Sequence, residues 1–427
     1  MNCSSAPLWG AVLIPISLTM KKLAFLFLIL FFAGCKNDTA PSLFDPNDQS
    51  NPAPVVRSIA PADSALAGAS EITLTGENFS AKKEDNIVYF DTAPVEILAA
   101  SATQLTVKSP NIISDSVKIR IAVLGAEKFS ATVRYKLKAA VAPFGKIEDP
   151  GYTANRDALR AYGIDVDLEG NIYLSTEQTI SGLVNSRIKK IAPNGVTTNL
   201  ATTTFLRANA LRIGPGNTLY ALYRTGRLRN IVTFSPAGVQ TPFVSLPGNA
   251  TDDVRDMDFD ANGNLWVTIG TDIYLIKPNQ AISRALTTAD TLSALRVYNG
   301  FVYFAGRNKT LPEEKVWRSR IDGETLAAKE VVLDVAAASW LNGRSVISLT
   351  FSESGDIYIG TTHPSGMFVV RGNNGEVLYP GLIAPSIYAL SWSNGNLVYA
   401  VRQINANLSQ LLKIDAAQKG APYHGRR

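Results

Sequence analysis

Arginines recur at two fixed distances from an aromatic residue that itself repeats along the second part of the chain. The repeated aromatic residues are Tyr173, Tyr220, Trp266, Tyr303, Tyr358 and Tyr399. Arg160 and Arg207 lie thirteen residues before one of these aromatic residues, and Arg255 and Arg344 lie within two positions of the same distance. The arginines four residues after an aromatic are Arg224 and Arg307. Guanidinium groups donate paired hydrogen bonds to carboxylates and sulfates. The spacing therefore predicts cationic side chains around one opening, where they would bind a polar, partly anionic ligand such as an acidic glycan.

The competing interpretation is that these arginines only solvate loop ends or pair with nearby acids. Asp157, Asp252, Asp253 and Asp290 are close enough in sequence to be such partners. An aromatic side chain near the opening would favour sugar binding, because sugar faces stack on aromatic rings. Trp340, in a loop that ends at Gly343, is the best candidate for that role. Its alternative is to pack between neighbouring repeats.

The repeat that carries these residues predicts a β-propeller over residues 139–427. Each of six copies has two short strands joined by a tight turn with glycine, as in Asp167–Tyr173, and most copies add a second hairpin. Four strands for every 48 residues or so form one propeller blade. The Asp-x-x-Gly-Asn-Ile-Tyr pattern resembles NHL-repeat six-bladed propellers. We expect Phe144–Ile147 to close the ring as an outer strand beside the last blade.

The enzymes that share this propeller architecture provide the rival hypothesis. Metal-dependent propeller lyases need several histidines, and this chain has only His363 and His424. Propeller lactonases of the gluconolactonase type hold calcium with Glu, two Asn and Asp, a set that Glu177, Asn209 and Asp253 match only in part. We assign no catalytic residue and no metal ligand, and we expect no cofactor, with calcium the open alternative. The chain is interpreted as a binding protein rather than an enzyme.

A smaller all-β segment, residues 55–138, comes before the propeller. Short alternating strands separated by glycine and proline predict an immunoglobulin-like β-sandwich. The run Ile72–Phe79, which closes on Gly-x-Asn-Phe, resembles the IPT/TIG family of immunoglobulin-like domains. That resemblance implies a spacer or interaction module. Phe79 is expected to fill the core rather than to bind a ligand.

The first residues predict a secreted, lipid-anchored protein. Lys21 and Lys22 precede an apolar run and the sequence Phe-Ala-Gly-Cys, which ends at Cys35 and resembles the lipobox of bacterial lipoproteins. That resemblance implies acylation of Cys35 and a membrane partner. Residues 1–35 are interpreted as an over-extended start, with Met20 the initiator, plus the signal peptide. Residues 36–54 are expected to be a flexible tether.

Composition excludes several other classes. The 427 residues carry 41 Lys+Arg and 36 Asp+Glu, dispersed along the chain, which does not indicate a nucleic-acid partner. Both cysteines lie within the first 35 residues, so a disulfide scaffold is excluded for the rest.

The whole chain resembles envelope lipoproteins of Bacteroidetes. This implies an outer-membrane lipoprotein, on the cell surface or the periplasmic face, that binds a glycan or an envelope protein for uptake or adhesion. The alternatives are a calcium-dependent hydrolase or lyase and an envelope assembly module. A basin lined by arginine and aromatic residues would favour binding, an oxygen cage would favour hydrolysis, and a filled channel would favour assembly.

Overall fold

The computed structural model describes residues 50–249, 251–308, 310–311 and 313–424. The predicted signal peptide, Cys35 and nearly all of the predicted tether lie outside these residues. A search of the described residues finds no helix with the length and apolar character needed to cross a membrane.

Within the described residues, 55–139 form two facing β-sheets, as expected for an immunoglobulin-like sandwich. One sheet has the order β1 (Val55–Ala60), β3 (Glu71–Glu77), β7 (Gln104–Lys108) and β6 (Ile97–Ala100). The other has the order β2 (Ala65–Ala67), β9 (Val133–Ala139), β8 (Ser114–Val123), β4 (Asn86–Phe90) and β5 (Ala93–Val95). Alternate residues of β3, Ile72 and Leu74, are fully buried between the sheets. Phe79 is 6% exposed and packs in the same core, which confirms its predicted role.

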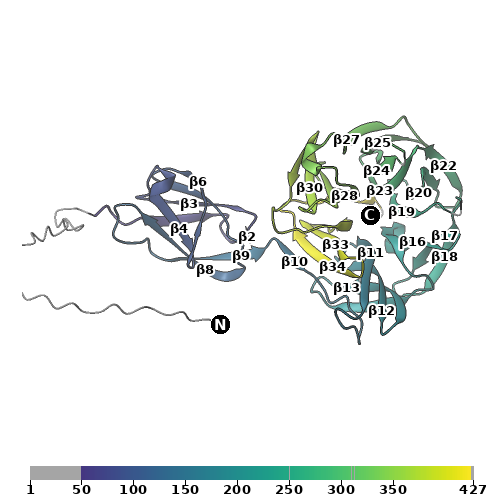
Figure 1. The fold of residues 1–427 in the computed structure, drawn as a ribbon, viewed down its shortest axis with the longest axis horizontal. Helices are drawn as coiled ribbons and strands as arrows, with labels where there is room; N and C mark the ends of the chain where they lie inside the picture. The colour runs from purple at the N-terminus through teal and green to yellow at the C-terminus, as the bar shows by residue number, and fades with distance from the viewer. Residues whose placement is uncertain (1–49, 250, 309, 312, 425–427) are drawn as a thin grey trace, which may run out of the picture. The chain divides into compact units, whose positions relative to one another are not determined.

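The described residues from 141 onward form a six-bladed β-propeller, whose blades surround a central axis (Figure 1). Blade 1 contains β11 (Ala158–Val166), β12 (Ile172–Ile180), β13 (Leu183–Ile191) and β14 (Thr197–Thr202). Blade 2 contains β15 (Ala208–Gly214), β16 (Thr218–Thr225), β17 (Leu228–Phe234) and β18 (Gln240–Ser245). Blade 3 contains β19 (Val254–Phe259), β20 (Leu265–Ile269), β21 (Asp272–Ile276) and β22 (Ile282–Thr287).

The remaining blades follow the same antiparallel order from the axis outward. Blade 4 contains β23 (Asp290–Tyr298), β24 (Phe301–Asn308), β25 (Glu314–Asp322) and β27 (Glu330–Asp334), with the short β26 (Thr325–Leu326) beside β25. Blade 5 contains β28 (Val346–Phe351), β29 (Ile357–Thr361), β30 (Met367–Arg371) and β31 (Asn374–Val377). Blade 6 contains β32 (Ile387–Trp392), β33 (Leu397–Asn405), β34 (Leu408–Asp415) and β10 (Val141–Pro143).

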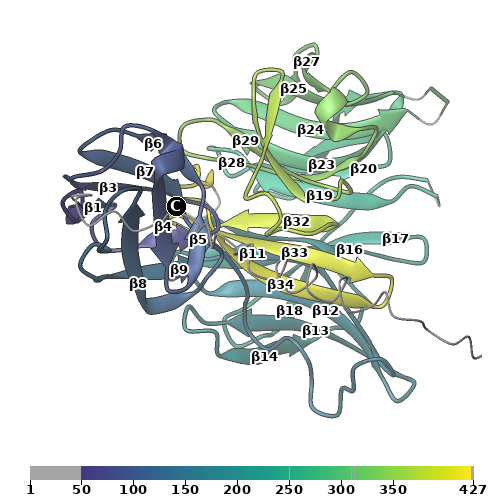
Figure 2. The ribbon, with the colours of Figure 1, turned by 60° about the vertical axis from the view of Figure 1, so that its left-hand side comes forward.

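The ring closes where the two ends of the propeller segment meet. β10 pairs with β34 as the outermost strand of blade 6, and blade 6 lies beside β11 of blade 1 (Figure 2). The closing strand is therefore residues 141–143, and its prediction at Phe144–Ile147 was wrong by a few residues. Phe144 still donates its N–H to the Leu411 carbonyl at 2.9 Å. Gly145, with φ at +67°, then turns the chain out of the ladder.

In blades 1 and 3, the turn between the first two strands is built around one aspartate. In blade 1, Asp167 accepts hydrogen bonds from the Asn171 backbone N–H at 2.7 Å and from the Asn171 side chain at 2.8 Å. The hydroxyl of Tyr173 also donates to Asp167, at 3.1 Å. Blade 3 repeats this arrangement with Asp260, Asn264 and Trp266. The aspartate, asparagine and aromatic residues of these two turns thus have a structural role.

Candidate functional site

The innermost strands of the propeller share an irregularity that forms the mouth of the central channel. In each of the six described inner strands, pairing with the next strand of the blade shifts at the same level, as in a β-bulge. The unpaired residues are Tyr162, Gly163, Asn209, Arg255, Asp256, Ser293, Ile347 and Tyr388. A bulge redirects side chains, so one end of the channel is lined by residues freed from the regular ladder.

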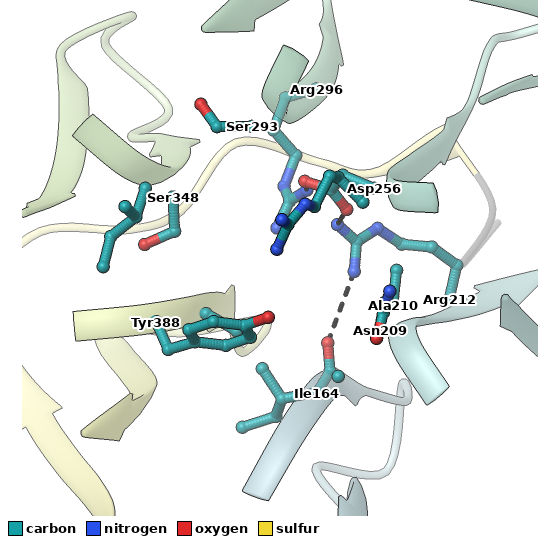
Figure 3. Close-up of a pocket in the computed structure, with 13 residues that line it drawn as sticks. Ile164, Asn209, Ala210, Arg212, Asp256, Ser293, Arg296, Ser348 and Tyr388 are labelled. Carbon is teal, nitrogen blue, oxygen red and sulfur yellow. Dashed lines mark hydrogen bonds and ion pairs between the residues drawn. The ribbon is translucent and has the colours of Figure 1, made fainter. Parts of the chain in front are cut away.

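Below the mouth, the channel is filled by a buried ionic network centred on Asp256. Arg212 contacts Asp256 at 2.6 Å (Nη2 to Oδ1), and Arg296 contacts it at 2.7 Å (Nη1 to Oδ2). The Leu295 backbone N–H also donates to Asp256 at 3.0 Å. Figure 3 shows both guanidinium groups converging on this carboxylate from β15 and β23. Such a network keeps two buried cations compensated.

Two further carboxylates complete the filled channel. Asp258 lies 3.7 Å from Arg212 (Oδ1 to Nε) and accepts the Val297 N–H at 2.9 Å. Asp165 accepts the Ser391 hydroxyl at 2.6 Å and the Ile213 N–H at 2.7 Å. Across Asp165, Asp256, Asp258, Arg212 and Arg296, three acids face two bases, an excess of 3 − 2 = 1 carboxylate. One of the three buried carboxylates therefore has no guanidinium charge to balance its own.

The pKa values in this network follow from that imbalance. Burial raises the pKa of Asp258 to about 7, although Arg212 and the Val297 amide act in the opposite direction. Burial also raises the pKa of Asp256, against the effect of Arg212. Burial lowers the pKa of Arg212, but the carboxylates around it outweigh that effect and hold its pKa above the ordinary value. A proton on Asp258 would leave the network electrically neutral.

The mouth itself is a small cavity of about 80 Å³ above Asp256. Asn209 is 7% exposed, and its Nδ2 donates to the Val254 carbonyl at 2.5 Å, which fixes the orientation of the amide. Its Oδ1 is buried and has no hydrogen-bond partner among the described residues. Leaving a buried acceptor unpaired costs about 1–3 kcal/mol. A ligand with a hydroxyl or N–H group would recover that cost.

Aromatic and hydroxyl side chains form the rest of the mouth. Tyr388 extends over the cavity with its hydroxyl toward the middle, while Ser293 and Ser348 lie on the other side (Figure 3). The rings of Tyr388 and Tyr162 meet edge to face, with centroids 6.0 Å apart. The guanidinium of Arg207 lies 5.0 Å from the centroid of the Tyr162 ring.

Four of the six predicted arginines lie around this mouth. Arg255 lines the mouth cavity, with its side chain 40% exposed and paired with Asp253 at 3.0 Å. Arg207 and Arg224 line an adjoining cavity of about 310 Å³ that shares Asn209 with the mouth. Arg307 lines another cavity, of about 670 Å³, that shares Arg255. The predicted grouping of cations at one opening thus includes these four side chains.

The structure does not bring the other predicted ligand residues to the mouth. Arg160 is held by Glu177 at 2.7 Å, by the Ala406 carbonyl at 2.8 Å and by Asn407 at 2.7 Å, so it joins blade 1 to blade 6. Arg344 is exposed and lines neither the mouth nor the two adjoining cavities.

Trp340 likewise has a packing role instead of the predicted ligand contact. Its ring lies 5.1 Å from that of Phe368, and its Nε1 donates to the Asn373 carbonyl at 3.3 Å. A Cβ at Gly375 would come within 2.3 Å of the indole, so the backbone of β31 packs directly on the ring. The glycine that accommodates the indole is Gly375, which is distant in sequence, and not the nearby Gly343 on which the prediction relied.

Two of the three side chains considered for calcium are engaged with cations. Glu177 binds Arg160 and Asp253 binds Arg255, whereas the Oδ1 of Asn209 has no partner among the described residues. In the part of the chain that the structure describes, no group of three or more His, Cys, Asp or Glu residues is placed to hold a metal ion. His363 accepts the Ser365 N–H at its Nδ1, at 3.0 Å.

The sequence does contain a signal for the mouth residues, at a different spacing. Eleven residues before the repeated aromatic lie Tyr162, Asn209, Arg255, Ile347 and Tyr388, and ten before it lies Ser293. Of these, only Arg255 was among the predicted ligand residues, and Asn209 was considered only for calcium. Aligning the repeats at that spacing would have found the complete set.

The fold and the mouth together define an all-β protein with an immunoglobulin-like sandwich and a six-bladed propeller that has a small cavity at one end of its channel. The family model of the IPT/TIG domain matches residues 54–136, which identifies the sandwich as a domain of that family. No curated protein matches the sequence of the chain.

Three solved structures of similar fold are distant in sequence. An auxiliary nutrient binding protein from Bacteroides thetaiotaomicron is 12% identical, with a TM-score of 0.47, over 87% of this chain and 98% of that one. A protein of the same description from Bacteroides ovatus is 12% identical, with a TM-score of 0.44, over 87% and 99%. A gluconolactonase from Xanthomonas campestris is 12% identical, with a TM-score of 0.47, over 60% and 86%.

Proposed function

We propose that this protein is an extracytoplasmic binding lipoprotein whose propeller mouth captures a polar, anionic ligand, an acidic glycan. Acylation of Cys35 would anchor it in the outer membrane, at the cell surface or on the periplasmic face. The IPT/TIG domain would then be the spacer between the anchor and the propeller. Capture for uptake or adhesion fits this order of parts.

The observation that carries the proposal is that a hydrogen-bond acceptor and a guanidinium line the same cavity at the mouth. Asn209 presents an unpartnered, buried Oδ1 acceptor, and Arg255 presents a half-exposed guanidinium in the same cavity. A sugar acid offers the complementary pair, because its hydroxyls donate and its carboxylate accepts. The tyrosines at the rim, Tyr162 and Tyr388, add apolar ring edges beside these polar groups.

The second candidate is an envelope assembly module, and the filled channel favours it. Arg212, Asp256 and Arg296 block passage along the axis. A propeller of that kind would use its rim to contact other envelope proteins. The two candidates differ at the mouth, since only ligand capture needs Asn209 and Arg255.

A binding screen separates these functions. The purified protein is expected to bind acidic glycans on an array with or without calcium, and Arg255→Ala is expected to weaken that binding about tenfold or more, since hydrogen bonds to charged groups contribute about 1.5–3 kcal/mol. Asn209→Ala should weaken it as well, through loss of the acceptor.

The matched control is Arg284→Ala, which removes the same charge from β22, at the outer edge of blade 3, where the side chain is 61% exposed. It should bind like the unaltered protein. Absence of binding to every acidic glycan would refute capture and favour assembly. Hydrolysis of the glycan that required calcium would instead favour the enzyme.

A further inference from the structure

We propose that the mouth continues into a second binding subsite between blades 4 and 5, so that the ligand is a linear acidic glycan rather than a single sugar. This inference rests on the proposed function of the mouth. It assigns Arg307 as the cation that binds a second charged unit of the chain.

The sizes of the cavities are the first reason. The mouth holds about 80 Å³, well below the roughly 300–1,000 Å³ of typical small-molecule pockets. The adjoining cavity between blades 4 and 5 holds about 670 Å³, which is within that range. Arg255 and Ser293 line both cavities, so the two are adjacent. The mouth accommodates an end group, and the larger cavity accommodates the units that follow.

The walls of this second subsite are made by paired strands. On β23 and β24, Thr291 pairs with Arg307, and on β24 and β25, Arg307 pairs with Glu314. Glu314 bridges to blade 5 by accepting the Ser345 hydroxyl at 2.9 Å and the Val346 N–H at 2.7 Å. These donors satisfy the hydrogen-bonding capacity of the only carboxylate among the described lining residues. Its single negative charge is outnumbered by the two arginines of the lining, Arg255 and Arg307.

The polar groups that remain are suited to an anionic sugar. The side chain of Arg307 is exposed, and its guanidinium makes no hydrogen bond or ion pair with any described residue. Thr291 Oγ1 is buried and without a partner among the described residues. A guanidinium beside threonine and serine hydroxyls pairs with a carboxylate flanked by hydroxyls. An acidic peptide offers the carboxylate but not the neighbouring hydroxyls, so the glycan is favoured.

The test compares chain lengths by titration calorimetry. Galacturonic acid and its linear trimer are titrated into the full-length protein and into its Arg307→Ala and Arg284→Ala variants. We expect the trimer to bind at least tenfold more tightly than the monomer. Arg307→Ala should weaken binding of the trimer about tenfold and binding of the monomer less than twofold. Arg284→Ala should leave both affinities unchanged. Unchanged melting temperatures establish that the variants remain folded.

The outcomes distinguish this inference from the function on which it rests. Equal affinities for monomer and trimer, or an Arg307→Ala effect that is the same for both, would overturn the second subsite while leaving the mouth intact. Failure of both sugars to bind would overturn the mouth as well. Hexa-aspartate is the third ligand. If it binds and the trimer does not, and if Arg307→Ala abolishes its binding, the proposal that the ligand is a glycan would be refuted.

Discussion

Replacing Asp256 with alanine is expected to lower the free energy of unfolding of the propeller by about 3–5 kcal/mol, the usual cost of breaking a buried ion pair. The reason is that Asp256 is shared. Arg212 and Arg296, with side chains 7% and 4% exposed, would both lose their shortest carboxylate contact. Each guanidinium would then remain buried with less compensation. Chemical denaturation followed by tryptophan fluorescence measures the loss, because Trp266, Trp317, Trp340 and Trp392 all lie in the propeller.

The matched control for this prediction is an exposed ion pair. Glu330 contacts Arg318 at 2.9 Å, but its side chain is 59% exposed, so Glu330→Ala should cost no more than about 1 kcal/mol. A triple variant that replaces Asp256, Arg212 and Arg296 with apolar residues should recover part of the loss, since no charge is left uncompensated. If Asp256→Ala cost as little as Glu330→Ala, the network would not stabilise the channel.

The contribution of Asp258 to the stability of the propeller is also expected to decrease as the pH rises from about 4 to 7. Burial raises the pKa of Asp258 to about 7, whereas an aspartate in the unfolded chain titrates near its ordinary value of about 3.9. Between these values the folded state holds a proton that the unfolded state has released. The contribution of Asp258 is therefore largest at low pH and is lost as the pH rises, by up to about 1.4 kcal/mol per unit, until Asp258 is ionised in both states.

The variant Asp258→Asn tests the assignment, because it cannot titrate. Its absolute stability is not the readout, since an amide cannot accept both the Val297 and Phe259 N–H groups that Asp258 accepts. The readout is the slope of the unfolding free energy with pH, which should flatten across this window. An equally steep slope in the variant would assign the titration to another group.

Much of the fold could be predicted because its signals are local. Each turn between the first two strands of a blade depends on a glycine and a nearby aspartate or aromatic, as at Asp167 and Tyr173, so the repeat is visible in the sequence. The closing strand was misplaced because its pairing with β34 is long-range. No local pattern distinguishes Val141–Pro143 from the residues that follow.

The candidate site was predicted less completely, for a physical reason. Of the four arginines predicted from the spacing of thirteen residues, Arg207 and Arg255 lie around the mouth. Arg160 faces Glu177 and Asn407 instead. Side chains of a regular strand alternate in direction, and a bulge changes that alternation. The direction of Asn209 and Tyr388 depends on a bulge, which places them eleven residues before the repeated aromatic rather than thirteen. Trp340 was misjudged because its packing partner, Gly375, lies in a different hairpin.

The shared bulge has a consequence for how such a propeller changes its specificity. Because the residues at this level lie outside the regular strand pairing, those other than Asp256 are substitutable one blade at a time without altering the hydrogen-bonded ladders on either side. Asp256 is the exception, because it is also the centre of the ionic network that holds the inner strands together. Apart from Asp256, the side chains that would contact a ligand and those that stabilise the ring thus form separate layers.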